Sequence, residues 1–139
     1  MAENPQRPQR ARPLSPHLTI YRWPVTMATS ITHRMTGIAL SAGTIVLAWW
    51  LIAAASGPES YAVFATAAQS IIGKVVLFAL TWSLCYHLLS GIRHLAWDLG
   101  YGFTVRKAEA MSWLVILGSV ALAAALFALA LAGKGGFNA

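Results

Sequence analysis

Three stretches of this chain are long, apolar and almost free of charge, and they restrict its possible folds more than any other feature. Residues 35–55 and 111–132 contain no charged residue, and a stretch from about 65 to 92 is interrupted only by Lys74 and His87. Each reaches the length of about 20 apolar residues that a membrane-spanning helix needs. Backbone polar groups in hydrocarbon must be satisfied internally, and three such segments cannot close a barrel. The sequence therefore predicts an all-α membrane protein with three transmembrane helices.

Composition supports this class and suggests two parts. Only 10% of the 139 residues are charged, against about 25% in a typical soluble domain. Residues 1–25 form an N-terminal arm rich in arginine and proline, without the apolar core of a secretory signal peptide. Residues 26–139 form the transmembrane anchor, and its three helices are predicted at about 26–55, 62–98 and 109–132.

Basic residues are concentrated on one side of the predicted membrane. Only Lys74 and Lys134 fall on the other side, whereas eight lie before the first span or around the second loop: Arg7, Arg10, Arg12, Arg22, Arg34, Arg93, Arg106 and Lys107. The positive-inside rule then predicts a cytoplasmic or matrix N-terminus and a C-terminus outside. The net charge of +6 is accounted for by these flanking segments, so nucleic-acid binding is not expected.

Ionisable residues inside the second span point to a ligand. An ionisable side chain in hydrocarbon costs about 2.5–3.5 kcal/mol and needs a partner, which for an imidazole is often a metal or a proton relay. His87 and His94 are seven residues apart, so they share one helix face about 10.5 Å apart along the axis. Ser30 and Arg34 form an i, i+4 pair at the start of the first span, where His33 also lies.

These residues are predicted to converge at the inner level of the membrane. Haem would suit them, with an axial imidazole from His87 and propionates neutralised by arginine and His33. No other histidine is predicted at the depth of His87, so a second axial ligand would come from another chain. Two simpler interpretations stay open, a hydrogen-bonded structural His87 and an Arg34 that snorkels to the interface.

Three motifs carry a resemblance to a known family. They are RPLSPHLTIY at residues 12–21, SITHRMTG at 30–37 and HLLSGIRHLAWD at 87–98. In this order and spacing they resemble the cytochrome b large anchor subunit of succinate dehydrogenase, respiratory complex II. The resemblance covers about residues 12–101, and the third span adds only a matching apolar segment.

The resemblance implies roles for individual residues. His87 matches the axial ligand of haem b, which is shared with a histidine of the small anchor subunit. His33 and Arg34 match contacts of the haem propionates. Ser30 and Arg34 match residues that line the ubiquinone site. These four residues are therefore expected to hold one haem b and part of the quinone-reduction site.

The resemblance also implies partners. The chain would form half of a heterodimeric helix bundle, and Arg93, His94 and Asp98 would lie near the docking surface of the iron–sulfur subunit. Succinate would be oxidised on a flavoprotein subunit, and electrons would reach the quinone through the iron–sulfur subunit. The chain would thus belong to an enzyme as a subunit, and in isolation it would neither bind nor oxidise succinate.

Two other functions compete with this interpretation. One is the anchor of a quinol:fumarate reductase, which runs the reaction in reverse, and the other is a structural membrane anchor without a cofactor. The first motif begins within about a dozen residues of Met1, which leaves little room for a presequence. We therefore expect a bacterial inner membrane as the location, with the mitochondrial inner membrane as the alternative.

Overall fold

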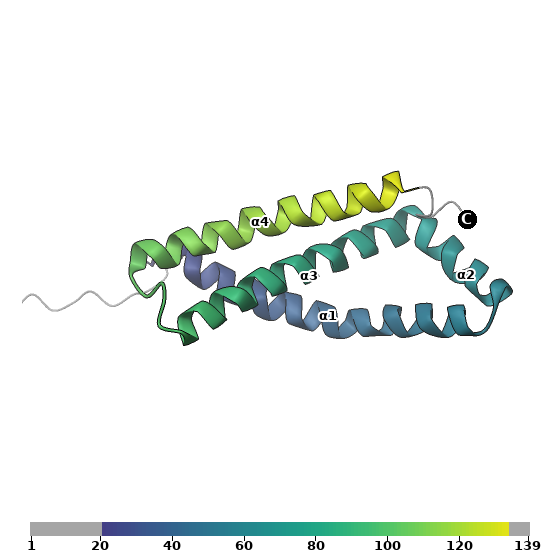
Figure 1. Ribbon diagram of the computed structural model, residues 1–139, viewed down its shortest axis with the longest axis horizontal. Coiled ribbons are helices and arrows are strands. Elements are labelled where there is room, and N and C mark those ends of the chain that lie inside the picture. The colour runs from purple at the N-terminus through teal and green to yellow at the C-terminus, as the bar shows by residue number, and fades with distance from the viewer. Residues whose placement is uncertain (1–20, 134–139) are drawn as a thin grey trace, which may run out of the picture.

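The computed structural model describes residues 21–133. In this range it contains the helices α1 (Val25–Ala55), α2 (Pro58–Gln69), α3 (Ile71–Asp98) and α4 (Val105–Ala132). Three of them, α1, α3 and α4, are long and apolar enough to cross a membrane, and they extend along the long axis of the molecule (Figure 1). The all-α prediction with three such helices is confirmed. Most of the predicted N-terminal arm, residues 1–20, lies outside the described residues.

The segment predicted as one helix over residues 62–98 is in fact two helices that meet at Ser70. The Ser70 backbone is extended, with φ −60° and ψ 157°, and its Oγ accepts a hydrogen bond of 3.0 Å from the Gly73 amide. Ser70 thereby caps the start of α3. A Cβ at position 73 would collide with the carbonyl oxygens of Ala67 and Ala68, so glycine permits this close turn. The prediction was wrong because hydropathy identifies an apolar stretch without showing where its axis changes direction.

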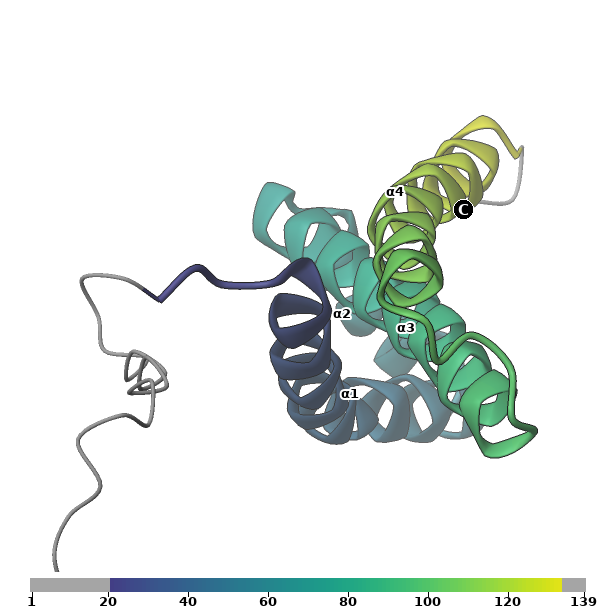
Figure 2. The ribbon, with the colours of Figure 1, turned by 90° about the vertical axis from the view of Figure 1, so that its left-hand side faces the viewer.

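Helix α3 contacts both other long helices, which lie on different sides of it (Figure 2). Helix α4 begins at Val105 rather than at the predicted residue 109. It packs through a seam of buried residues at spacings of three and four: Ser112, Val115, Ser119 and Ala123. Small side chains at such a seam let two helix backbones approach closely. The small residues of α4 therefore favour its close packing in the bundle.

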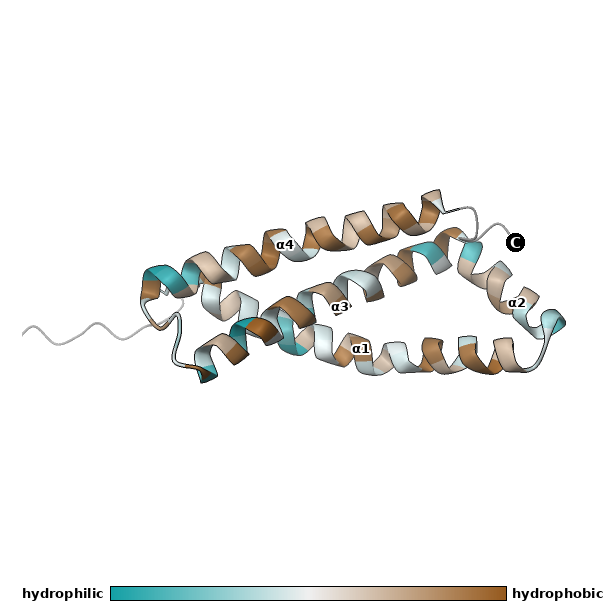
Figure 3. Cartoon of the chain, in the orientation of Figure 1, coloured by the Kyte–Doolittle hydropathy of each residue, from teal (hydrophilic) through white to brown (hydrophobic). Residues whose placement is uncertain are grey.

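Polarity is distributed as expected for a chain surrounded by lipid. Hydrophobic residues cover most of the three long helices, with hydrophilic groups mainly near the ends of the helices and around α2 (Figure 3). Many large apolar side chains are exposed, whereas the buried polar and charged residues are Thr29, Thr36, Ser83, Ser90, Arg93, Ser112 and Ser119. Burial of polar groups in a membrane bundle requires internal hydrogen bonds. The polar interior is therefore where functional side chains can be held in place.

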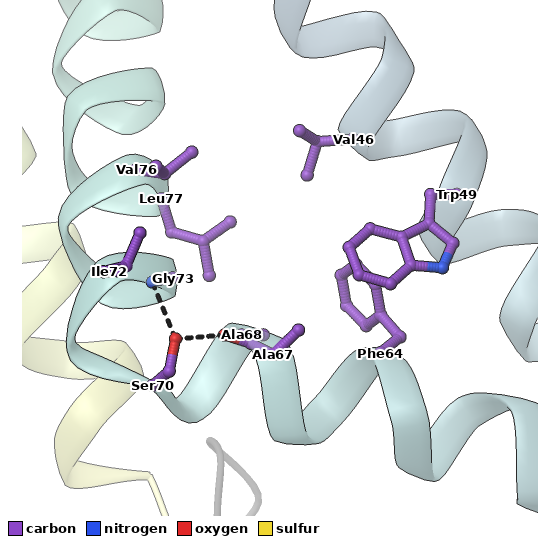
Figure 4. A pocket seen from close by; sticks show the side chains of 10 residues that line it. All are labelled: Val46, Trp49, Phe64, Ala67, Ala68, Ser70, Ile72, Gly73, Val76 and Leu77. Atoms are coloured by element: carbon purple, nitrogen blue, oxygen red, sulfur yellow. Dashed lines mark hydrogen bonds between the residues drawn. The ribbon is translucent and has the colours of Figure 1, made fainter.

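An apolar pocket of about 320 Å³ lies where α1, α2 and α3 meet (Figure 4). Trp49 of α1 and Phe64 of α2 meet edge to face in its wall, with ring centroids 5.0 Å apart. None of its ten lining residues is titratable: Val46, Trp49, Phe64, Ala67, Ala68, Ser70, Ile72, Gly73, Val76 and Leu77. The pocket therefore lacks the groups that acid–base or metal chemistry would need.

Candidate functional site

Three histidines from two helices form a continuous group. His33 of α1 stacks on His87 of α3, with ring centroids 4.0 Å apart and planes inclined by 20°. His33 also meets His94, with centroids 5.2 Å apart. Two helical turns separate His87 from His94 on α3, and His33 fills the space between them. The predicted convergence of the three imidazoles is thus present in the fold.

Thr36 contacts the His87 ring at Nδ1. The buried Thr36 hydroxyl donates to the His33 carbonyl oxygen at 2.8 Å, and its Oγ1 lies 3.3 Å from Nδ1 of His87. A hydroxyl has one proton to donate and can also accept hydrogen bonds. Because that proton is directed to the carbonyl, Oγ1 is free to accept a hydrogen bond from an Nδ1–H of His87. In that tautomer a neutral His87 carries its lone pair on Nε2.

Glycine at position 37 lets α1 approach this ring. A Cβ at Gly37 would come within 3.2 Å of Cε1 of His87 and 3.7 Å of its Nδ1. Such a contact would be tighter than ordinary packing and would push the imidazole away from α1. The pair Thr36-Gly37 therefore supplies both the polar partner and the space that the His87 ring needs.

Arg93 links the three long helices. Its guanidinium Nη1 donates to Thr29 Oγ1 of α1 at 2.7 Å and to Ser112 Oγ of α4 at 2.8 Å. The hydroxyl of Tyr86 donates to the Thr29 carbonyl oxygen at 3.2 Å. Arg93 is only 2% exposed. Its side chain therefore lies inside the bundle, where its hydrogen bonds join the three long helices.

The arginine is also joined to the histidine group through Trp97. The Arg93 guanidinium carbon lies 4.7 Å from the centroid of the Trp97 ring, and Trp97 meets His94 edge to face at 5.1 Å. Such cation–π contacts are worth about 2 kcal/mol or more when desolvated. Within residues 21–133, Nε and Nη2 of Arg93 are buried without a hydrogen-bond partner, as is Nδ1 of His33.

The remaining predicted site residues lie towards the outside of the bundle. Ser30 is half-buried and Arg34 is exposed. Arg34 follows His33 directly in α1, so it is turned by about 100° from the face that meets α3. His94 is half-buried, and Asp98 is exposed at the end of α3. The structure thus brings together the histidines and Arg93 and leaves Arg34 on an outer face.

Four residues of this region did not emerge from the sequence as site candidates: Thr29, Thr36, Tyr86 and Ser112. A signal for two of them exists, because Thr29, His33 and Thr36 follow the i, i+4, i+7 spacing of one helix face. Ser112 gave no comparable signal, since its role depends on a contact with Arg93 across the bundle.

Comparison with known proteins agrees with this architecture. The family model described as "Succinate dehydrogenase/Fumarate reductase transmembrane subunit" matches residues 8–126. The chain is 46% identical over 112 residues to the succinate dehydrogenase cytochrome b556 subunit of Paracoccus denitrificans, covering 81% of this chain and 86% of the relative.

Two further relatives extend the comparison. The cytochrome b556 subunit of Rickettsia conorii is 39% identical over 127 residues, covering 91% of this chain and 99% of the relative. The mitochondrial cytochrome b560 subunit of Bos taurus is 43% identical over 121 residues, covering 81% of this chain and 70% of the relative.

The family match includes most of the three long helices and every candidate residue described above. The relatives are named as subunits of succinate dehydrogenase in both bacteria and mitochondria. The chain therefore belongs to the succinate dehydrogenase/fumarate reductase transmembrane subunit family and is a cytochrome b membrane subunit of succinate dehydrogenase, respiratory complex II.

Proposed function

We propose that this chain holds a haem b through Nε2 of His87 and that Ser30 and Arg34 form part of the site where ubiquinone is reduced. As a multi-pass subunit of complex II, the chain lies in a bacterial or mitochondrial inner membrane. The observation that carries the proposal is the contact between Thr36 Oγ1 and Nδ1 of His87. It supports an imidazole with hydrogen on Nδ1, in which Nε2 keeps the lone pair that a metal requires.

The donor set fits a haem. The relatives' name, cytochrome b556, implies haem b, and a macrocycle needs only axial ligands from the protein. Within residues 21–133 there is no group of three or more His, Cys, Asp or Glu side chains suited to a metal ion, so a site built entirely from side chains has no support there. The unpartnered Nδ1 of His33 and the exposed Arg34 are suited to the propionates.

A bound haem b supplies one-electron chemistry at the depth of His87. The protein's contribution is to orient the imidazole, to neutralise the carboxylates through His33 and Arg34, and to exclude water. We propose that the second axial histidine comes from the small anchor subunit, with which this chain would form a heterodimeric bundle.

The quinone site would use the outer face of α1. Ser30 and Arg34 lie one turn apart on the same side of the helix, and Arg34 has no place in the bundle interior. A quinone carbonyl gains negative charge on reduction, so a hydroxyl and a guanidinium would stabilise it. We place this site on the side of the iron–sulfur subunit, from which electrons arrive, while succinate stays on the flavoprotein subunit.

The assignment of His87 as the axial ligand is tested by the variant His87→Leu in the assembled complex. We expect loss of the low-spin bis-histidine spectrum of the dithionite-reduced and oxidised complex, while the helix still inserts, because leucine favours the membrane. His94→Leu, two turns away on the same helix face, is the matched control and should keep the low-spin spectrum.

An unchanged spectrum in His87→Leu would move the axial ligand to His94 or His33. Absence of any b-type band from the unaltered complex would favour the alternative of a cofactor-free anchor. The other alternative, an anchor that serves fumarate reduction, differs in the direction of electron flow and is separated by measuring both reactions in the same complex.

A further inference from the structure

We propose that Thr36 is a positioning residue for the haem-ligating imidazole. Its hydroxyl sets the tautomer of His87 and the orientation of the ring, so that Nε2 is directed to the metal with raised basicity. This inference rests on the proposed function, because it matters only if His87 is the axial ligand.

The two hydrogen bonds of Thr36 define the tautomer. The contact with the His33 carbonyl oxygen is the shorter, at 2.8 Å against 3.3 Å for the contact with Nδ1 of His87. A backbone carbonyl is always an acceptor, so the hydroxyl proton belongs to that bond. The tautomer with hydrogen on Nε2 would leave two lone pairs, on Oγ1 and Nδ1, facing each other. The geometry therefore selects hydrogen on Nδ1.

Burial strengthens this selection. Thr36 is 2% exposed, and water has little access to replace the bond between its hydroxyl and His87. In surroundings of low dielectric constant a hydrogen bond is electrostatically stronger and an unmade one costs more. The i−3 bond to His33 also holds the Thr36 rotamer, so Oγ1 stays directed at the imidazole.

The stacked ring of His33 limits the tilt of the His87 ring, while Thr36 fixes its rotation. His33 stacks on one face of His87 at 4.0 Å, and the absent side chain of Gly37 leaves space beside Cε1. A ring confined in this way has little freedom to turn its Nε2 away. Hydrogen-bond partners behind a ligating histidine typically change metal affinity 10–100-fold when removed.

The test compares Thr36→Val with Thr36→Ser in the assembled complex. Valine keeps the branched shape and removes the hydroxyl, whereas serine keeps the hydroxyl and removes a methyl group. The readouts are the rate at which excess apomyoglobin removes haem and the midpoint potential of the haem. We expect haem retention to fall about 10–100-fold in Thr36→Val.

The potential should change in a defined direction. Without a hydrogen-bond acceptor at Nδ1, the imidazole is a weaker electron donor and the oxidised metal is less stabilised, so the midpoint potential should rise in Thr36→Val. Thr36→Ser should stay close to the unaltered complex in both measurements. For Thr36→Ala we expect the same loss of haem retention and the same rise in midpoint potential as for Thr36→Val. This variant is used if Thr36→Val does not assemble.

Retention and potential unchanged in both hydroxyl-free variants would overturn the inference, as would equal losses in valine and serine variants. These outcomes differ from failure of the proposed function, in which His87→Leu itself would leave the low-spin spectrum intact. If His87→Leu abolishes that spectrum and Thr36→Val changes nothing, His87 remains the ligand and only the role of Thr36 is rejected.

Discussion

Adjacent residues of α1 have different surroundings although they share one short motif. Thr29, His33 and Thr36 point into the bundle, where Thr29 and Thr36 are buried and His33 is half-buried. Ser30 and Arg34 follow Thr29 and His33 directly and are less enclosed, with Arg34 exposed. One residue turns an α-helix by about 100°, so the motif serves two faces. The inner face supports His87, and the outer face is available to a quinone or a propionate.

The proposed role of the outer face of α1 in quinone reduction is tested by Ser30→Ala and Arg34→Leu. Loss of a donor to a developing negative charge should cost about 2–4 kcal/mol, and partial exposure favours the lower value, which is about a 30-fold drop in turnover. We therefore expect succinate–quinone turnover to fall strongly, while succinate oxidation by an artificial acceptor that takes electrons upstream of the quinone is spared.

Arg22→Leu is the matched control, since Arg22 is also exposed near the start of α1 and has no proposed role at the quinone. Its two activities should remain equal to those of the unaltered complex. If instead both activities of the Ser30 and Arg34 variants fell together with the amount of assembled complex, these residues would be structural and Arg34 would be a snorkelling arginine.

At the scale of the elements, Arg93 makes α3 the element that holds the bundle together. It bonds to α1 through Thr29 and to α4 through Ser112. Both hydroxyls also donate to carbonyl oxygens of their own helices, Thr26 at 2.9 Å and Ala108 at 2.8 Å. Removal of the arginine would leave the hydroxyls partnered, whereas removal of the hydroxyls would leave a buried cation without acceptors. Removal of the hydroxyls should therefore lower the stability of the complex more than removal of the arginine.

We expect Thr29→Val and Ser112→Ala each to destabilise the complex by about 1.5–3 kcal/mol, the range for hydrogen bonds to charged groups. Adding Arg93→Met to the pair Thr29→Val and Ser112→Ala should recover much of this loss, because the unpaired buried charge is removed. Thermal denaturation of the detergent-solubilised complex measures the changes. Strictly additive losses in the triple variant would show that the arginine is not compensated by these hydroxyls.

At the scale of the whole molecule, α1 is the least enclosed of the three long helices. Its buried residues are Thr29, Thr36 and Ala53, while large apolar residues along the rest of the helix are exposed. In a membrane such a surface meets lipid or another subunit, which agrees with a bundle completed by the proposed small anchor subunit. The histidine group lies near the start of α1 and the end of α3, the end that the basic residues predict to be cytoplasmic or matrix-facing.

The predicted orientation is tested by single cysteines in a Cys85→Ala background. Ser60 in α2 and Glu109 in α4 are exposed at opposite ends of the molecule, and an acidic residue contributes little to topology. A membrane-impermeant maleimide should label Ser60→Cys from the outside and Glu109→Cys only in inverted vesicles. The opposite labelling pattern would reverse the topology. The background variant should remain unlabelled in both preparations.

The sequence by itself determined the class of fold and most of the histidine site. Charge-poor windows require helices because hydrocarbon leaves backbone groups no other partner, and the seven-residue spacing places His87 and His94 on one face. Hydropathy did not show the helix break at Ser70, which is a local turn capped by that serine. Local periodicity also could not show the burial of Arg93 or the contact between Thr36 and the His87 ring. These last two depended on tertiary contacts: Arg93 meets Thr29 and Ser112 on other helices, and Thr36 lies 51 residues from His87 in the chain. Only the packing of α1 on α3 brings that hydroxyl to the ring, and a hydrogen bond across helices exists only once both are placed.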